Sequence, residues 1–202
     1  MFVTSAEAAQ ELTVSARQVR RAIDSGRLTS TRAGHAHLLS SRAVHAHART
    51  THRGRPWALR TQEAALDLLS SGVTQAHTGT ELSRLKTRIR GMSVSALSGQ
   101  ILSDRVSLRR RTQRVSDARY PVSIASDLGL SGLGGLGILV AEHASHAARR
   151  ARLALDDSGD VAVVEGQQNH RHVLEALTLF AWGNAREHTA AEAWLIEQQR
   201  LR

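Results

Sequence analysis

Residues 13–26, TVSARQVRRAIDSG, predict a short amphipathic helix that decides the fold of the first part of the chain. Thr13 or Ser15 offers a hydroxyl group that can cap the first turn, and Gly26 can end the helix in the left-handed conformation at little cost. One side of the helix is apolar, with Val14, Val19 and Ile23. The other side carries guanidinium and amide groups, from Arg17, Gln18, Arg20 and Arg21. Such groups bind phosphates and base edges, so the stretch predicts a DNA-recognition helix.

The segments on both sides of this helix extend the prediction to a small module. Upstream, Thr4 and Glu7 have the spacing of a capping box, which predicts a first helix. Downstream, residues 28–32 alternate and have high β propensity, and residues 35–39 can return as a second strand. A third helix is expected to begin near Ser41. The expected order is helix, turn, helix, two-stranded wing, helix.

Residues 8–47 resemble the winged helix-turn-helix module of excisionases and MerR-type regulators. The matching residues are Ala8, Ala9, Leu12, Val14, Ser15, Arg17, Val19, Arg20, Gly26, Leu28, Arg32, Gly34, Leu38 and Leu39. The wing departs from the family pattern, because His35 and His37 stand where Arg or Trp is common. The resemblance implies a recognition helix in the major groove and a wing over the DNA backbone.

This module supplies the predicted DNA contacts. Arg17, Gln18 and Arg21 are expected to reach base edges, and Arg20 and Arg32 to bind phosphates. The full predicted set is Ser15, Arg17, Gln18, Arg20, Arg21, Arg32, His35 and His37.

The positive charge of the chain is concentrated in its first two thirds. The 202 residues carry a formal net charge of +9 at pH 7. Residues 1–60 contain 10 arginines against 3 acidic residues, residues 61–120 contain 10 basic against 5 acidic residues, and residues 121–202 contain 7 arginines against 10 acidic residues. The first two segments suit a polyanion, and we expect double-stranded operator DNA as the partner.

Other features of the composition exclude several classes of protein. The chain has no cysteine, which excludes disulfides and cysteine-based zinc sites. The first residues, MFVTSAEAAQ, contain neither the basic nor the apolar segment of a secretory signal. No window approaches the ~18 consecutive apolar residues of a membrane helix. We therefore expect a cytoplasmic protein without membrane contact.

Periodicity and composition predict a mainly α protein with small β elements and four parts. These are a winged helix-turn-helix domain (1–50), a basic linker (51–60), a basic helical unit (61–120) and a small α/β domain (121–202). The linker is either a solvated hinge or a basic arm that tracks a DNA groove. Trp57 is expected to plug the edge of the next domain.

The middle unit is expected to contain three helices, which begin near Thr61, Thr80 and Ser93. Residues 106–115, VSLRRRTQRV, follow as a basic strand or the start of a hairpin, so a second winged-helix-like unit is one possibility. The densest basic cluster of the chain lies here: Arg109, Arg110, Arg111 and Arg114. It is either a second phosphate contact or a solvated run that pairs with the acidic last third.

In the last third we expect a helix over residues 142–155, a buried strand over 161–164, a helix over 170–182 and a final helix from Asn184. Residues 156–166 and 170–195, together with residues 85–97, resemble the C-terminal region of actinobacterial helix-turn-helix proteins of the AbiEi type. Those are antitoxins of type IV toxin–antitoxin systems. The resemblance implies a DNA-binding autorepressor with a nucleotidyltransferase-like toxin as its partner.

Enzymatic and metal chemistry have less support. Residues 132–137, GLGGLG, match the G-x-G-x-x-G pattern, but the segment before them is short and interrupted by Gly129, so a glycine-rich loop is the ordinary explanation. The carboxylates of residues 156–160 suit a turn. No carboxylate lies near the histidine-rich segment 35–47 to complete a zinc site. We predict no enzymatic activity, no cofactor and no metal.

The combined prediction is a sequence-specific DNA-binding transcriptional repressor. The alternative is an excisionase-like architectural factor that bends DNA for a recombinase. Such factors consist of little more than the winged module, so the large α/β part argues against this alternative.

Overall fold

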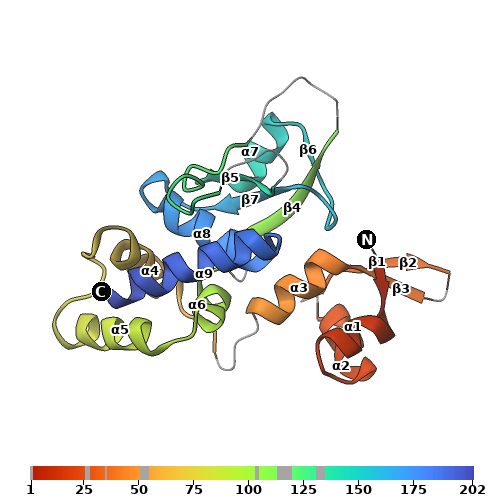
Figure 1. Ribbon diagram of the computed structural model, residues 1–202, viewed down its shortest axis with the longest axis horizontal. Helices are drawn as coiled ribbons and strands as arrows, with labels where there is room; N and C mark the ends of the chain where they lie inside the picture. The colour runs from red at the N-terminus through yellow and green to blue at the C-terminus, as the bar shows by residue number, and fades with distance from the viewer. Residues whose placement is uncertain are drawn as a thin grey trace.

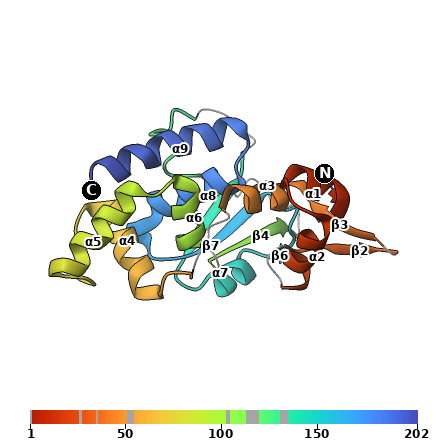
Figure 2. The ribbon, with the colours of Figure 1, turned by 90° about the horizontal axis from the view of Figure 1, so that it is seen from below.

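The computed structural model describes residues 2–25, 28–34, 36–50, 55–102, 105–112, 120–130 and 135–202. It shows a mixed α/β protein in which helices predominate and the strands form two small sheets, in agreement with the predicted fold class (Figure 1). The elements of residues 2–50 lie at one end of the long axis, and α5 (Gly79–Gly91) lies at the other end (Figures 1 and 2).

The first 50 residues form helices and strands in the expected order. The elements are β1 (Phe2–Thr4), α1 (Ser5–Glu11), α2 (Ala16–Asp24), β2 (Thr31–Ala33), β3 (Ala36–Ser40) and α3 (Ser41–Thr50). Strand β1 was not predicted; it pairs antiparallel with β3, which lies between β1 and β2 in a three-stranded sheet. The module has a buried cluster of its own, which contains Val3, Ala8, Ala9, Val19, Ala22, Leu28, Leu39 and Val44.

The remaining elements form a larger body. They are α4 (Leu59–Ser71), α5, α6 (Val94–Leu102), β4 (Val106–Arg111), β5 (Gly137–Ala141), α7 (Ala144–Arg150), β6 (Leu153–Leu155), β7 (Val161–Glu165), the 3-10 helix η1 (Gln168–His170), α8 (Arg171–Trp182) and α9 (Ala185–Arg200). Helix α4 begins at Leu59 with Ala58 as its N-cap, two residues before the Thr61 that we expected to start it.

The predicted helix over residues 142–155 is wrong in its second half. Helix α7 ends at Arg150, Arg152 has a positive φ of 53°, and residues 153–155 form strand β6. An L-residue in the left-handed region ends a helix, so the alanine-rich helical pattern cannot continue through this point.

The second sheet has the strand order β5-β7-β4-β6. Strands β5 and β7 are parallel, and β4 is antiparallel to both β7 and β6. The predicted basic strand is therefore present as β4. Among the described strands, however, its partners come from the last third of the chain. Within the described residues, neither the hairpin nor the second winged-helix-like unit that we considered is formed around β4, and residues 113–115 of the predicted strand lie outside the described ranges.

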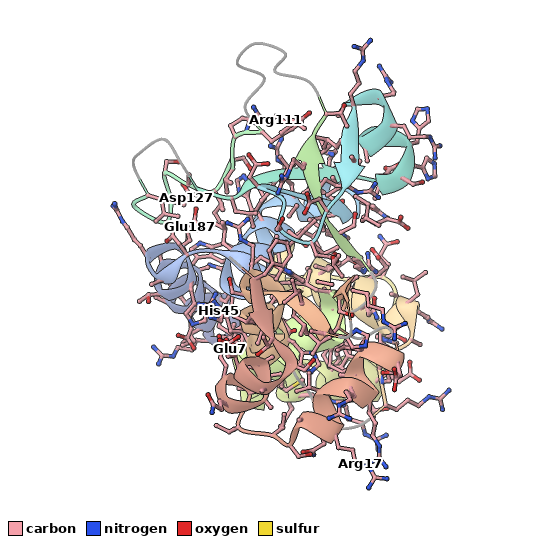
Figure 3. The ribbon with its side chains drawn as sticks, turned by 90° about the vertical axis from the view of Figure 1, so that its right-hand side faces the viewer. Glu7, Arg17, His45, Arg111, Asp127 and Glu187 are labelled. Carbon is pink, nitrogen blue, oxygen red and sulfur yellow. The ribbon has the colours of Figure 1, made fainter. Side chains whose placement is uncertain are left out.

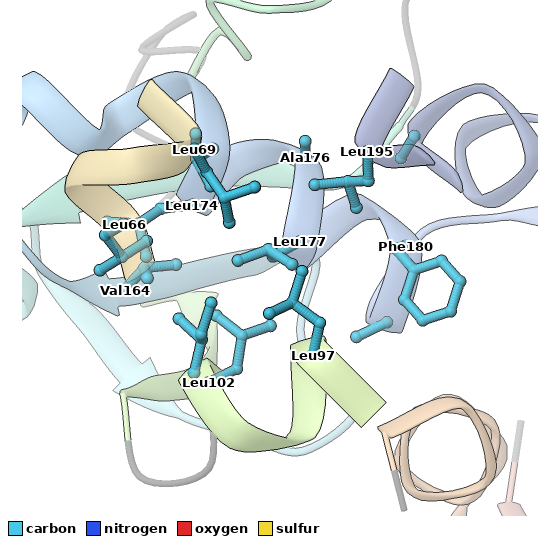
Figure 4. Close-up of a cluster of buried hydrophobic side chains, with 14 of the residues drawn as sticks. Leu66, Leu69, Leu97, Leu102, Val164, Leu174, Ala176, Leu177, Phe180 and Leu195 are labelled. Atoms are coloured by element: carbon cyan, nitrogen blue, oxygen red, sulfur yellow. The ribbon is translucent and has the colours of Figure 1, made fainter. Parts of the chain in front are cut away.

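One buried cluster joins the middle helices to the last third. Helix α8 is buried from Val173 to Ala181 and is covered by α4, α6 and α9 (Figure 4). Helix α8 thus lies at the centre of this core, and its two buried polar residues, Glu175 and Thr178, are hydrogen-bonded. Trp57 is 7% exposed and packs into the same cluster, so its predicted plugging role is confirmed. The cluster contains residues from both sides of residue 120. The domain boundary that we predicted at residue 120 stays a prediction.

Within the described ranges, no helix combines the length and the hydropathy that a membrane span requires.

Candidate nucleic-acid interface

The turn between α1 and α2 is built by hydrogen bonds at residues 12–14. The N–H groups of Leu12 and Val14 donate to the carbonyl oxygens of Ala8 and Ala9 at 2.9 and 3.0 Å. Thr13 occupies the left-handed region with φ 52°, and its hydroxyl donates to the carbonyl of Leu12 at 2.8 Å. The chain therefore turns within three residues, and α2 packs against α1.

Ser15 caps α2 through a complete capping box. The Gln18 N–H donates to Ser15 Oγ at 3.3 Å, and Gln18 Oε1 accepts from the Ser15 N–H at 2.9 Å. The Ser15 hydroxyl also donates to Gln18 Oε1, at 3.0 Å. Of the two cap residues that we considered, the structure selects Ser15. Gln18, predicted to reach a base edge, has its amide oxygen in the cap, which leaves its Nε2 group for the predicted base contact while the cap is closed.

Helix α2 has one buried and one cationic face. Val19 and Ala22 are buried in the core of the module. Arg17, Arg20 and Arg21 are exposed, and they share the opposite face because they lie three and four positions apart. None of the three has a side-chain partner among the described residues, and Arg17 projects away from the protein in Figure 3. The predicted helix with two faces is therefore present, whereas Gly26, its predicted stop, lies outside the described residues.

The carboxylates of α1 are already engaged. Thr4 donates its N–H to Glu7 at 2.7 Å and its hydroxyl at 2.9 Å, and these bonds hold the pKa of Glu7 below its ordinary value. Glu11 pairs with His45 of α3. Neither carboxylate is therefore aligned with the arginines of α2.

The hairpin β2–β3 places two of the predicted wing residues opposite each other. Arg32 and His37 are register partners, so their side chains share one face. Arg32 is exposed, and His37 Nδ1 lies 2.9 Å from the Ser30 hydroxyl. Gly34 has φ 60° at the tip, as the predicted turn requires. His35, also predicted to contact DNA, lies outside the described residues.

Helix α3 holds this module against the body. Arg42 Nη1 donates to the carbonyl oxygen of Gly159 at 2.6 Å. Arg49 Nη1 donates to the carbonyl oxygens of Ala181 and Gly183 at 3.3 and 2.9 Å, and burial lowers the pKa of its guanidinium. Neither residue was predicted from the sequence. Their spacing on one helix face was the available signal, but their acceptors are backbone carbonyls distant in sequence.

The second basic cluster is divided by strand β4. Alternate residues of a strand point to opposite faces, so Arg109 and Arg111 lie on one side of the sheet and Arg110 on the other. Arg110 Nε lies 2.8 Å from the Asp156 carboxylate, and the Arg111 guanidinium lies 5.5 Å from the ring centroid of Tyr120. Pairing with the acidic last third is thus confirmed for Arg110. A phosphate contact by this cluster stays a prediction, and Arg114 lies outside the described residues.

The described residues on both sides of the glycine-rich segment do not have the arrangement of a dinucleotide site. Strand β5 begins at Gly137 and follows the glycines, whereas a dinucleotide site needs a strand that runs into the first glycine. Gly132, Leu133 and Gly134 lie outside the described residues. The Asp156 carboxylate accepts from the Ser158 N–H at 2.8 Å and from its hydroxyl at 2.6 Å, which is the predicted turn.

Comparison of the chain with protein-family models, with curated proteins and with solved structures found no match.

Proposed function

We propose that the protein is a sequence-specific DNA-binding transcriptional repressor with a winged helix-turn-helix at its N-terminus. In this proposal, α2 enters the major groove and the β2–β3 hairpin lies over the phosphate backbone. One observation carries the proposal: three exposed arginines without partners among the described residues stand on the outer face of a short helix whose inner face is held in a core.

The electrostatics of the module support this assignment. An arginine that folding does not use keeps its five donors for phosphates and base edges. Arg17, Arg20 and Arg21 meet this condition on α2, and Arg32 meets it on the wing. The capping and pairing of Glu7 and Glu11 remove the nearest competing carboxylates on α1.

The attachment of α3 to the body also favours a regulator over a free-standing DNA-bending module. Arg42 and Arg49 fix the orientation of the helix-turn-helix relative to α8 and the second sheet. We propose further, from the resemblance of the last third to AbiEi-type antitoxins, that the protein represses its own promoter and neutralises a nucleotidyltransferase-like toxin. Co-expression of the chain with the product of the adjacent gene, scored by growth, tests that extension.

The proposal is tested by fluorescence anisotropy with the full-length protein. The probes are a duplex from the region upstream of its own coding sequence and a shuffled duplex of equal composition. Arg17→Ala and Arg21→Ala are each expected to weaken binding to the upstream duplex by about 1–3 kcal/mol. Arg200→Ala is the matched control, because Arg200 is an exposed arginine on α9.

Two results contradict the proposal. One is equal affinity of the parent protein for both duplexes, and the other is unchanged binding by both α2 variants. A circular-permutation assay of DNA bending examines the architectural alternative. A large bend without preference for the upstream duplex supports that alternative instead.

A further inference from the structure

Helix α7 presents a stripe of cationic and imidazole groups that the DNA-binding proposal does not use. His143, His146, Arg149 and Arg150 are exposed, and they follow one face of the helix at intervals of three and four positions. The opposite face packs on the second sheet through Ala148, which is 1% exposed. At a rise of about 1.5 Å per residue, the stripe is about 10 Å long, enough to span two successive phosphates of a DNA strand.

The arginines of this stripe differ from most others in the last third. Arg171 binds Glu175, Arg186 donates to the carbonyl of Gly129, and Arg202 donates to the carbonyl of Leu69. Arg149 and Arg150, by contrast, have no side-chain partner within the part of the chain that the structure describes. These two side chains therefore keep all their donors.

Two acidic groups that follow α7, Asp156 and Asp157, are engaged elsewhere. Asp156 is bound by Arg110 and Ser158, and Asp157 is hydrogen-bonded to Thr29. Helix α7 (Ala144–Arg150) itself contains no carboxylate, and the exposed Glu142 lies just before it. Along the sequence this surface is hidden, because seven arginines are outnumbered by ten acidic residues in that segment.

Helices α7 and α2 lie on the same side of the molecule (Figures 2 and 3). Figures 2 and 3 place α7 and α2 on one side of the molecule, with α9 on the other side. In Figure 3, Arg17 lies at the lower end of that side and α7 lies at its upper end. Arg42 and Arg49 fix α3 to the body. They therefore fix the position of the α2 arginines relative to the exposed stripe of α7.

We propose that the exposed stripe of α7, centred on Arg149 and Arg150, binds the phosphate backbone of the same DNA duplex that α2 recognises. The inference rests on the proposed function and adds a second, sequence-independent contact to it. Guanidinium contacts to phosphates position a protein on DNA and strengthen binding to every sequence equally. The stripe therefore sets affinity and footprint length, and α2 sets specificity.

The test compares the double variant Arg149→Ala/Arg150→Ala with the control Arg84→Ala/Arg200→Ala. Both variants remove two exposed arginines and change the net charge equally. The control residues lie on α5, at the far end of the long axis, and on α9, on the side away from α2. Arg200 matches Arg149 and Arg150 further, since all three occupy the last turn of a helix.

Affinity for the upstream and the shuffled duplex is measured across a salt series. Each lost phosphate contact lowers the slope of log K against log salt by about 0.9, so the α7 variant is expected to lose about two units on both duplexes. The ratio of the two affinities is expected to stay at the parent value. Hydroxyl-radical footprinting of the variant should lose protection at one edge of the footprint only.

Each outcome decides the inference. Equal salt slopes for the α7 variant and the control overturn it. In that case an acidic protein becomes the candidate partner of the stripe. A changed affinity ratio also overturns it, because a backbone contact carries no sequence information.

If the parent protein binds neither duplex, the proposed function fails as well. If the parent protein prefers the upstream duplex and only the slope test fails, the proposed function is retained and the inference about α7 is rejected. Thermal unfolding of both variants checks that α7 remains folded.

Discussion

Arg49 of α3 donates to the carbonyl oxygen of Gly183, which follows the last residue of α8, at 2.9 Å. The same nitrogen lies 3.3 Å from the carbonyl oxygen of Ala181. The last carbonyls of a helix have no partner within the helix. A guanidinium that reaches them from another element both satisfies α8 and holds the N-terminal module on the body.

Replacement of Arg49 by Met should therefore lower the free energy of unfolding by about 1–2 kcal/mol, since it removes charge-assisted hydrogen bonds from a partly buried position. Urea denaturation measures the loss. Arg20→Met serves as the control, because Arg20 is exposed on α2 and has no partner among the described residues. Equal midpoints for the two variants would show that Arg49 does not stabilise the contact.

The backbone at Thr13 predicts a stabilising substitution. A threonine with φ 52° is strained, because the left-handed region costs an L-residue about 1–2 kcal/mol and asparagine tolerates it better. Thr13→Asn is expected to raise the free energy of unfolding by up to about 1 kcal/mol. Thr13→Val, which keeps the branched side chain and loses the hydroxyl bond to Leu12, is expected to lower it. The reverse order in thermal unfolding would contradict this account of the turn.

Gly159 lies against strand β4. A Cβ atom at this position would lie 2.0 Å from the carbonyl oxygen of Arg109, which is backbone and cannot yield like a side chain. Gly159→Ala is therefore expected to cost about 3 kcal/mol. At Gly91, the last residue of α5, a Cβ meets no atom within 4 Å, so Gly91→Ala should gain about 0.5 kcal/mol. Chemical denaturation of both variants checks the contrast, and equal stabilities would refute it.

Asp156 and Asp157 should respond to pH in opposite directions. Hydrogen bonds from Ser158 hold the pKa of Asp156 below its ordinary value of 3.8, so its ionised form stabilises the fold above that pH. This contribution is lost as the pH falls through the lowered pKa. Burial raises the pKa of Asp157 above 3.8, although a hydrogen bond with Thr29 opposes the shift. The folded state then binds that proton more tightly, so stability is lost as the pH rises through the raised pKa.

The corresponding variants separate the two groups. Asp156→Asn should be less stable than the parent at pH 7, and Asp157→Asn should be more stable. Both stability differences should shrink in acid. The difference for Asp157→Asn should be gone once the pH has fallen to the ordinary pKa of 3.8, whereas the difference for Asp156→Asn should disappear only below the lowered pKa of Asp156. Urea denaturation at a series of pH values measures them. A shared sign at pH 7 would contradict the assignment.

Local signals account for what the sequence analysis predicted correctly. The cap at Ser15, the two faces of α2 and the turn at Gly34 each depend on residues within a few positions of one another. Strand β1 was missed because three residues carry no periodicity and its partner Leu39 is distant in sequence. The same limit applies to strand β4, whose partners lie in the last third.

The stabilising polar contacts were harder to predict for a related reason. Glu187 and Gln199 are buried on α9, a position that apolar periodicity cannot reveal. Gln199 donates to the carbonyl oxygens of Ile89 and Met92 at 2.6 and 2.9 Å, and Glu187 accepts from the Leu136 N–H at 3.2 Å. The partners are backbone groups of other elements, so only the fold brings them together. Arg42 and Arg49 belong to the same class.

The buried cluster that crosses residue 120 has a consequence for synthesis on the ribosome. The core of the N-terminal module is complete once Val44 has left the exit tunnel. The apolar faces of α4 and α6, by contrast, stay uncovered until α8 and α9 follow. At about 5–20 residues per second, the roughly 100 residues from the end of α6 to the end of α9 take about 5–20 seconds. During this interval, a nascent chain carries a folded N-terminal module on an unfinished body, and its middle helices are exposed to chaperones.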